Sequence, residues 1–192
     1  MNLQHVNVKL MVDSPTEADL ALLIPIFHAW IQSQVFEELL LDVADYRHVP
    51  AGPGVVLIGH QANYSVDNAG NRLGIRYNRK AELEGNNQKR LAQAARAALV
   101  ACQRLEAEPT LAGKFGFSGR ELEIFINDRL LAPNSGPTFE EARPDLQRFA
   151  ERLFGGSQYS LSHNRDPRKL FGVSLRASDS FPLATLLNNL EK

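Results

Sequence analysis

Apolar and polar positions alternate near the start of the chain, in the segment VNVKLMVD at residues 6–13. Alternation with a period of two is typical of a strand that buries one face, here the face of Val6, Val8 and Leu10. Further segments with the composition of strands cover residues 39–49, 55–67 and 72–78. The turn sequences PAGPG and NAGN separate them, so together they predict an antiparallel meander.

Helical spacing of apolar residues appears in two segments of this first part. Residues 18–32 follow SPTE, in which Ser14 can cap the helix and Glu17 can complete a capping box. Pro25 lies inside this helix and predicts a kink about one turn earlier. A longer helix is expected at residues 86–108. Its buried stripe of small side chains comprises Leu91, Ala95, Ala98, Cys102 and Leu105.

The hairpin between residues 55–67 and 72–78 can be given a register. If Asp67 pairs with Arg72, Tyr64 lies opposite Ile75 on an apolar face, and Asn63 lies opposite Arg76 on a polar face. The sequence therefore predicts a sheet with one buried face and one solvated face.

The second part of the chain has a similar order of elements. Strands are expected at residues 121–128, 157–163 and 170–177, and helices at 139–156 and 180–190. We divide the chain into a first βαβββα half at residues 1–107, a Gly-rich link at 108–120 and a second βαββα half at 121–192, packed as one globular unit. The similar orders suggest an internal duplication of a βαββα unit, although residue identity between the halves is poor.

These elements predict an α+β fold. We expect a mainly antiparallel sheet of about seven strands with its helices packed mostly on one face.

Composition narrows the class of protein. The chain has 192 residues, 44% of them apolar, and a net charge of -1. It therefore lacks the positive field of a nucleic-acid binder, and we expect no nucleic-acid partner. No segment approaches the roughly 18 apolar residues of a membrane span, and no leader pattern opens the chain, so we expect a cytoplasmic protein without membrane contact.

One polar cluster carries candidate catalytic residues. Strand alternation places Asp42 and His48 on one face of their strand, and His60 and Tyr64 on one face of the next, with Asp45 nearby. Histidine titrates near neutral pH and a carboxylate can orient its ring, so these residues suit general acid-base chemistry. The alternative is that His60 is a structural histidine at the sheet margin.

Other candidates concern binding. Lys114 and Arg120 flank the glycines of GKFGFSGR, and Arg79 precedes a helix start, so each can contact an anionic ligand. Trp30 and Phe36 lie beyond the buried stripe of their helix and are candidates for an interface that supports self-association or binds a protein partner; the alternative is that both complete the local core. The histidines and the single cysteine show no ligand spacing, so no metal site is predicted.

Function follows from these patterns. GPGVVLIGH lacks the Lys-Ser/Thr ending of a phosphate loop and no other cofactor motif occurs, so no cofactor is expected. We expect a non-catalytic ligand-binding or accessory protein that acts through a sheet face or a partner interface. The alternative is a small cofactor-independent enzyme that uses the His/Asp/Tyr cluster.

Overall fold

The structure, a computed structural model, describes residues 1–13, 19–111 and 113–191. Its strands are β1 (Val6–Met11), β2 (Leu40–Tyr46), β3 (Gly54–Gly59), β4 (Ala62–Asp67), β5 (Gly74–Arg79), β6 (Glu121–Ile126), β7 (Tyr159–His163) and β8 (Phe171–Ala177). Its α-helices are α1 (Leu23–Ser33), α2 (Asn87–Glu106), α3 (Gly136–Leu153) and α4 (Leu183–Glu191). Three short 3₁₀ segments are η1 (Leu20–Leu22), η2 (Ala69–Asn71) and η3 (Pro109–Leu111).

All the strands belong to one antiparallel sheet, in the order β2-β3-β4-β5-β1-β6-β8-β7. The predicted α+β class is confirmed. The first strand of the chain lies in the interior of the sheet, between β5 and β6. Strands β2 and β7 are the two edges.

The structure has eight strands because residues 55–67 do not form one strand. They divide into β3 and β4 at a tight turn made by His60 and Gln61, which carries no Gly or Pro. The hairpin register also differs from the prediction: Tyr64 pairs with Tyr77, and Asp67 with Gly74. The six-residue connection at 68–73, which contains η2, is longer than the predicted four-residue turn. The register error is two residues, so each side chain keeps its predicted face.

The two halves take comparable places on either side of the β1–β6 pair. Next to β1 lie β5 and then β4, and next to β6 lie β8 and then β7. This arrangement is compatible with a duplicated unit, but strand order does not establish common ancestry, and the internal duplication stays a prediction.

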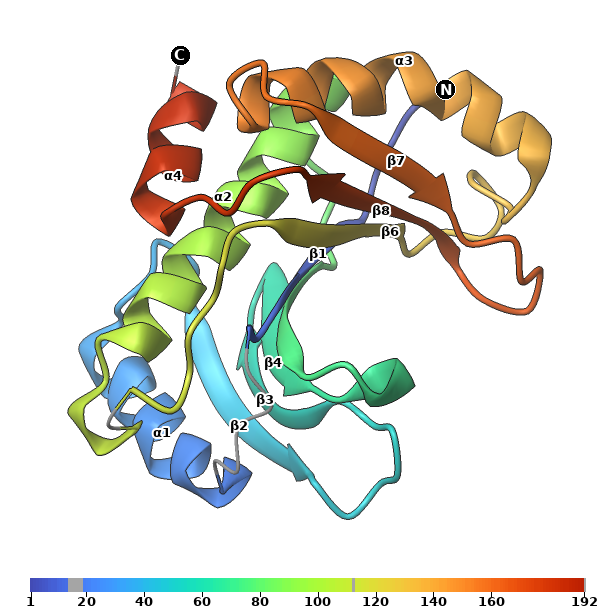
Figure 1. Cartoon of the computed structure of the whole chain (residues 1–192). Helices are drawn as coiled ribbons and strands as arrows, with labels where there is room; N and C mark the ends of the chain where they lie inside the picture. Colours follow the sequence, from blue (N-terminus) through green and yellow to red (C-terminus); the bar gives the residue numbers. More distant parts are fainter. Residues whose placement is uncertain (14–18, 112, 192) are drawn as a thin grey trace.

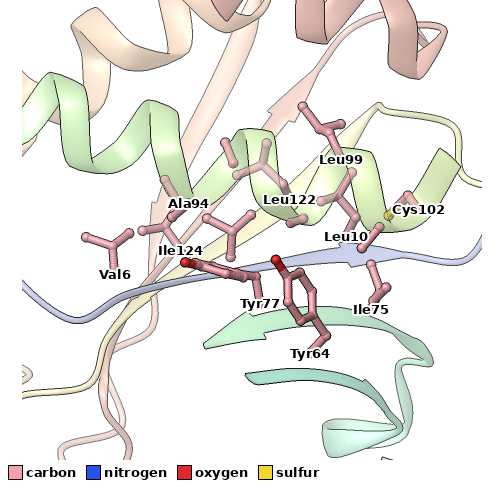
Figure 2. Close-up of a cluster of buried hydrophobic side chains, with 14 of the residues drawn as sticks. Val6, Leu10, Tyr64, Ile75, Tyr77, Ala94, Leu99, Cys102, Leu122 and Ile124 are labelled. Atoms are coloured by element: carbon pink, nitrogen blue, oxygen red, sulfur yellow. The ribbon is translucent and has the colours of Figure 1, made fainter. Parts of the chain in front are cut away.

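The helices lie on one side of the sheet, as Figure 1 shows, with α2 running across the centre. Its small side chains Ala94, Ala98 and Cys102 are fully buried, which lets its backbone approach the strands closely. Figure 2 shows how Tyr64, Tyr77 and the apolar residues of β1, β5 and β6 fill the space beneath α2. We call this side of the sheet the helix side.

Helix α1 begins later than predicted. Pro25 lies in its first turn, where no intrahelical donor is required, and the predicted kink corresponds to the change from η1 to α1 at Leu22 and Leu23. The predicted cap formed by Ser14 and Glu17 lies outside the described residues. At the start of α2, the side chain of Asn86 accepts a hydrogen bond from the backbone N–H of Lys89 at 2.9 Å.

No described helix covers the opposite side, which we call the open face. Polar residues of successive strands meet there in register: Ser65 pairs with Arg76, Arg76 with Lys9, and Lys9 with Glu123. A second row joins Asn63 to Asn78 and Asn78 to Asn7. Two of the strands in these rows, β4 and β5, place their alternate residues Tyr64 and Tyr77 in the helix-side core.

Candidate functional site

A buried ion pair lies at the centre of the open face. Lys9 Nζ donates a hydrogen bond to Asp67 Oδ1, and both side chains are 3% exposed. The two residues lie on β1 and β4, so the lysine must pass over the intervening strand β5. Gly74 of β5 makes this passage possible, because a Cβ there would lie 3.0 Å from Lys9 Cε and 2.3 Å from the Leu10 carbonyl oxygen.

Three asparagines form a row next to this pair. Buried side-chain atoms without a hydrogen-bond partner include the Oδ1 atoms of Asn7, Asn63 and Asn78 and the Nδ2 atom of Asn7. A buried amide group normally has its hydrogen bonds satisfied, because leaving one unmade costs about 1–3 kcal/mol. Asn63 and Asn78 of this row line the pocket described below, whereas Asn7 is fully buried beside them.

Arg76 lies between the asparagines and the ion pair. Its Nε is also buried without a partner, and among the described residues it has no ion-pair or hydrogen-bond partner. Its guanidinium carbon lies 4.8 Å from the centre of the Phe125 ring, which holds it in a cation-π contact. Burial lowers the pKa of Arg76, and the carboxylates of Asp67 and Glu123 oppose this effect.

Both of those carboxylates have a different cation as their direct partner. Asp67 pairs with Lys9, and Glu123 Oε1 accepts a hydrogen bond from Arg72 Nη1 at 2.8 Å. Arg76 is therefore a half-buried charged side chain that interacts with both carboxylates but is the direct partner of neither. Such a side chain is costly to bury, which favours a functional role for it.

Arg76 lines a pocket of about 500 Å³, which we call the open-face pocket. Its volume falls within the range of small-molecule sites. Strands β3, β4 and β5 form its floor, and the loop between β2 and β3 contributes Ala51, Gly52 and Pro53 to its wall. The remaining lining residues are Tyr46, Val56, Ile58, Asn63, Ser65, Asp67, Ala69, Arg76 and Asn78.

The structure does not gather the predicted acid-base cluster. Asp42 is exposed and its Oδ1 accepts a hydrogen bond from the N–H of Val43. Asp45 is exposed, and its two carboxylate oxygens accept hydrogen bonds from the Arg47 guanidinium. Side-chain and backbone hydrogen bonds from Arg47 lower the pKa of this carboxyl to about 2. His48 is exposed, with its ring 6.4 Å from that of Tyr46.

His60 and Tyr64 are separated as well. His60 is exposed in the turn between β3 and β4, so the buried contact that a structural histidine would need is not seen. Tyr64 is 3% exposed and faces the helix side. Burial raises its pKa well above the ordinary value, so the hydroxyl stays protonated at neutral pH. The open-face pocket contains none of Tyr64, His48 and His60, and the pocket on the helix side that Tyr64 lines contains neither histidine.

The predicted anion-binding residues lie far apart in the fold. Lys114 is exposed, and Arg120 is exposed with its Nε donating to the Ala177 carbonyl oxygen at 3.3 Å. Arg79 is different: it is 9% exposed and lines a second pocket, of about 490 Å³, on the helix side. We call this the helix-side pocket.

The predicted exposure of Trp30 is wrong. Trp30 is 4% exposed, and its Nε1 donates to Glu108 Oε1 at 2.6 Å. Phe36 is half-buried, stacks on Tyr64 with ring centres 4.6 Å apart, and lines the helix-side pocket. The two aromatics complete the local core, because the loop after α1 folds back over β4. Their role in an interface stays a prediction without an exposed patch to support it.

Sequence reasoning missed the open-face residues as a site. The signal was present: Asn7 and Lys9 interrupt an otherwise apolar strand, and Asn63, Ser65 and Arg76 fall on the face already identified as polar. What the pattern did not indicate is that Asn7, Lys9 and Ser65 are buried and that Asn63 and Arg76 are half-buried. Among the described residues, no group of three or more His, Cys, Asp or Glu side chains is placed to hold a metal ion.

In the described part of the chain, no helix has the length and apolar content needed to cross a membrane. No family model, curated protein sequence or solved structure matches this chain.

Proposed function

We propose that this protein binds a small anionic molecule, one that carries a phosphate or carboxylate group beside hydroxyl or amide groups, in the open-face pocket. The observation that carries the proposal is the guanidinium of Arg76, which lines the pocket without a carboxylate partner among the described residues. Arginine binds carboxylate and phosphate groups through paired N–H donors, and this bond strengthens where water is excluded.

The charges around the pocket support an anion over a cation. Asp67 and Arg76 are its charged lining residues, and Asp67 is already bonded to Lys9. A bound anion would therefore give the Arg76 guanidinium a direct partner. A bound cation would have to compete with Lys9 for Asp67.

The asparagine side chains account for the hydroxyl or amide groups that we assign to the ligand. Asn63 and Asn78 line the pocket beside Arg76, and each amide can donate and accept hydrogen bonds. Ser65 adds a hydroxyl from the same floor. The side chain of Tyr46 adds an exposed ring at the wall. A ligand that carries hydroxyl or amide groups next to its anionic group uses all of these contacts.

The same observations favour binding over catalysis. The residues suited to acid-base chemistry, His48 and His60, line neither pocket, and Asp45 is held by Arg47. In the open-face pocket the Asp67 carboxylate is bonded to Lys9, and no hydrogen bond joins the Ser65 hydroxyl to a carboxylate or histidine among the described residues. The proposed role is therefore that of a ligand-binding protein acting through a sheet face.

The test compares matched probes by thermal shift and isothermal titration calorimetry. Glycerol 3-phosphate and glycerate carry a phosphate and a carboxylate on similar bodies, and glycerol is their uncharged match. We expect one of the two anions to raise the melting temperature and glycerol to have no effect, since only a ligand that prefers the folded state stabilises it.

Two variants locate the site. Arg76→Gln should weaken anion binding at least about tenfold, because hydrogen bonds to charged groups contribute about 1.5–3 kcal/mol. Arg176→Gln is the control, since Arg176 lies on the same face of the sheet, on β8, but outside the pocket. Equal weakening in both variants, equal binding of glycerol, or no anion binding at millimolar concentration would contradict the proposal.

A further inference from the structure

The helix-side pocket lies on the reverse of the same strands. Strands β4 and β5 contribute Tyr64, Tyr77 and Arg79 to it, and α2 contributes Gln93, Arg96, Ala97 and Val100, which share one helical face. The loop after α1 closes it with Val35, Phe36, Glu37 and Glu38. Its position is independent of the open-face pocket, because alternate residues of a strand point to opposite sides of the sheet.

Arg79 is the first indication of a ligand there. Its Nε donates to the Ala81 carbonyl oxygen at 2.9 Å, and its Nη2 donates to that of Glu82 at 3.3 Å. These two bonds fix the guanidinium but do not neutralise its charge. Among the described residues Arg79 has no carboxylate partner, although it is more than nine-tenths buried.

Tyr64 is the second indication. Its ring is packed between Phe36 and Tyr77, with centres 4.6 and 5.2 Å away. Its hydroxyl has no hydrogen-bond partner among the described residues. Figure 2 shows the hydroxyl ends of Tyr64 and Tyr77 on the side of the sheet that α2 covers. The Tyr77 hydroxyl accepts a hydrogen bond from Gln93 Nε2 at 3.0 Å and has Gln93 Oε1 as an acceptor at 3.4 Å. Of these two tyrosines, Tyr64 is therefore the one whose hydroxyl has no partner among the described residues.

The remaining walls are apolar or already engaged. Val35, Ala97 and Val100 provide aliphatic surface, and Phe36 provides an aromatic ring. Arg96 is bonded to Glu191 at 2.6 Å. Glu38 Oε1 accepts the N–H of Gln61 at 2.5 Å, which directs this carboxylate to the β3–β4 turn.

We propose that the helix-side pocket is a second binding site, and that it takes a small carboxylic acid with an apolar body. The carboxylate accepts hydrogen bonds from Tyr64 and from the unused nitrogen of Arg79, and the body lies against Phe36, Ala97 and Val100. Glu37 is exposed at the mouth, where water and salt screen its repulsion of the ligand. The buried charge of Arg79 is the one that the ligand meets.

Matched probes test the chemistry. Phenylacetate, phenylacetamide and phenethylamine share one body and differ in the polar group. Ligand-observed NMR and titration calorimetry should show that the acid binds at least about tenfold more tightly than the amide, since a charged partner strengthens these hydrogen bonds. Equal or tighter binding of the amide or the amine overturns the proposal, and so does the absence of acid binding at millimolar concentration.

Variants test the place. Tyr64→Phe keeps the ring and removes the donor, and should weaken phenylacetate several-fold to about tenfold. Ala97→Trp fills the pocket from α2 without changing charge and should abolish binding. Both variants leave Arg79 unchanged, because removing its bonds to the Ala81 and Glu82 carbonyl oxygens would cost stability. Circular dichroism checks that each variant is folded.

Arg76→Gln separates this site from the open-face pocket. It should abolish binding of the polar anion on the open face and leave phenylacetate binding unchanged. Ala97→Trp should do the reverse. If phenylacetate binding is lost in Arg76→Gln and kept in Ala97→Trp, the acid occupies the open face and the second site is refuted, while the first proposal stands.

Discussion

Breaking the Lys9–Asp67 ion pair from one side should destabilise the protein strongly. Each side chain is 3% exposed, so Lys9→Met leaves a buried carboxylate without its cation, and Asp67→Asn leaves a buried ammonium without its anion. Removing one partner of a buried pair costs about 3–5 kcal/mol. In a chain of this length, each kcal/mol lowers the melting temperature by about 2–4 °C, so each single variant should melt about 6–20 °C lower.

Removing both charges should cost much less than the sum of the single losses. In Lys9→Met/Asp67→Asn no charge is left unpaired, and the asparagine still offers a carbonyl oxygen to the N–H of Ala69, which Asp67 binds at 3.2 Å. We expect a coupling energy of at least about 2 kcal/mol, above the level at which independent sites add.

Urea unfolding followed by circular dichroism measures all four proteins. Arg143→Gln is the control, because Arg143 forms an exposed ion pair with Glu140 and its loss should cost less than about 1 kcal/mol. Additive losses in the cycle, or single variants as stable as the control, would refute the reasoning from burial.

Three further outcomes are expected. In carboxyl NMR titrations Asp45 should show a pKa of about 2, and this pKa should return toward the ordinary value in Arg47→Gln. Because the pKa is lowered, the stabilising effect of the Asp45–Arg47 contact is fully present above the unfolded pKa and is lost as the pH falls through about 2. Cys102 should resist thiol reagents in the native protein and react at once in urea, because it is fully buried and burial raises its pKa. No strand lies on the outer side of β2, where Gln34 bonds the backbone of Leu40, and Leu41 and the preceding Leu39 are exposed, so the rest of this edge should pair with a second copy. Leu41→Lys should weaken the dimer in light scattering, and a wild-type mass that stays at 21.3 kDa at micromolar concentration rejects it.

The sequence predicted the fold class and the two faces of the sheet because these depend on local alternation. Tyr64 and Asn63 lie on the faces expected of them, even though their partners differ by two residues. The turn residues misled the register: His60 and Gln61 turn the chain without Gly or Pro, and NAGN forms part of a longer connection. Turn length depends on the packing of both strands, which a single segment does not encode.

The candidate sites were predicted less well for a physical reason. Residues such as His48 can be chosen from a sequence as candidate catalytic groups, because their acid-base chemistry depends on the residue type alone. We propose Arg76 and Arg79 as ligand-binding residues because neither has a direct carboxylate partner among the described residues. The absence of such a partner depends on the whole fold and not on the local sequence. Arg79 was identified from its charge. Arg76 was assigned to a solvated face, because nothing in the local pattern shows that the neighbouring strands half-bury it.

The interior position of β1 constrains how the chain can be made. The first strand to leave the ribosome has β5 on one side and β6 on the other, so its backbone stays half unpaired until residue 126 has been synthesised. Lys9 also remains in water until β4 has been made, because its partner is Asp67. Nascent chains that end after α2 should expose a sheet edge in what becomes the centre of the protein, and such edges are prone to aggregate. The central edge of the sheet is therefore covered only once β6 of the second half has been made.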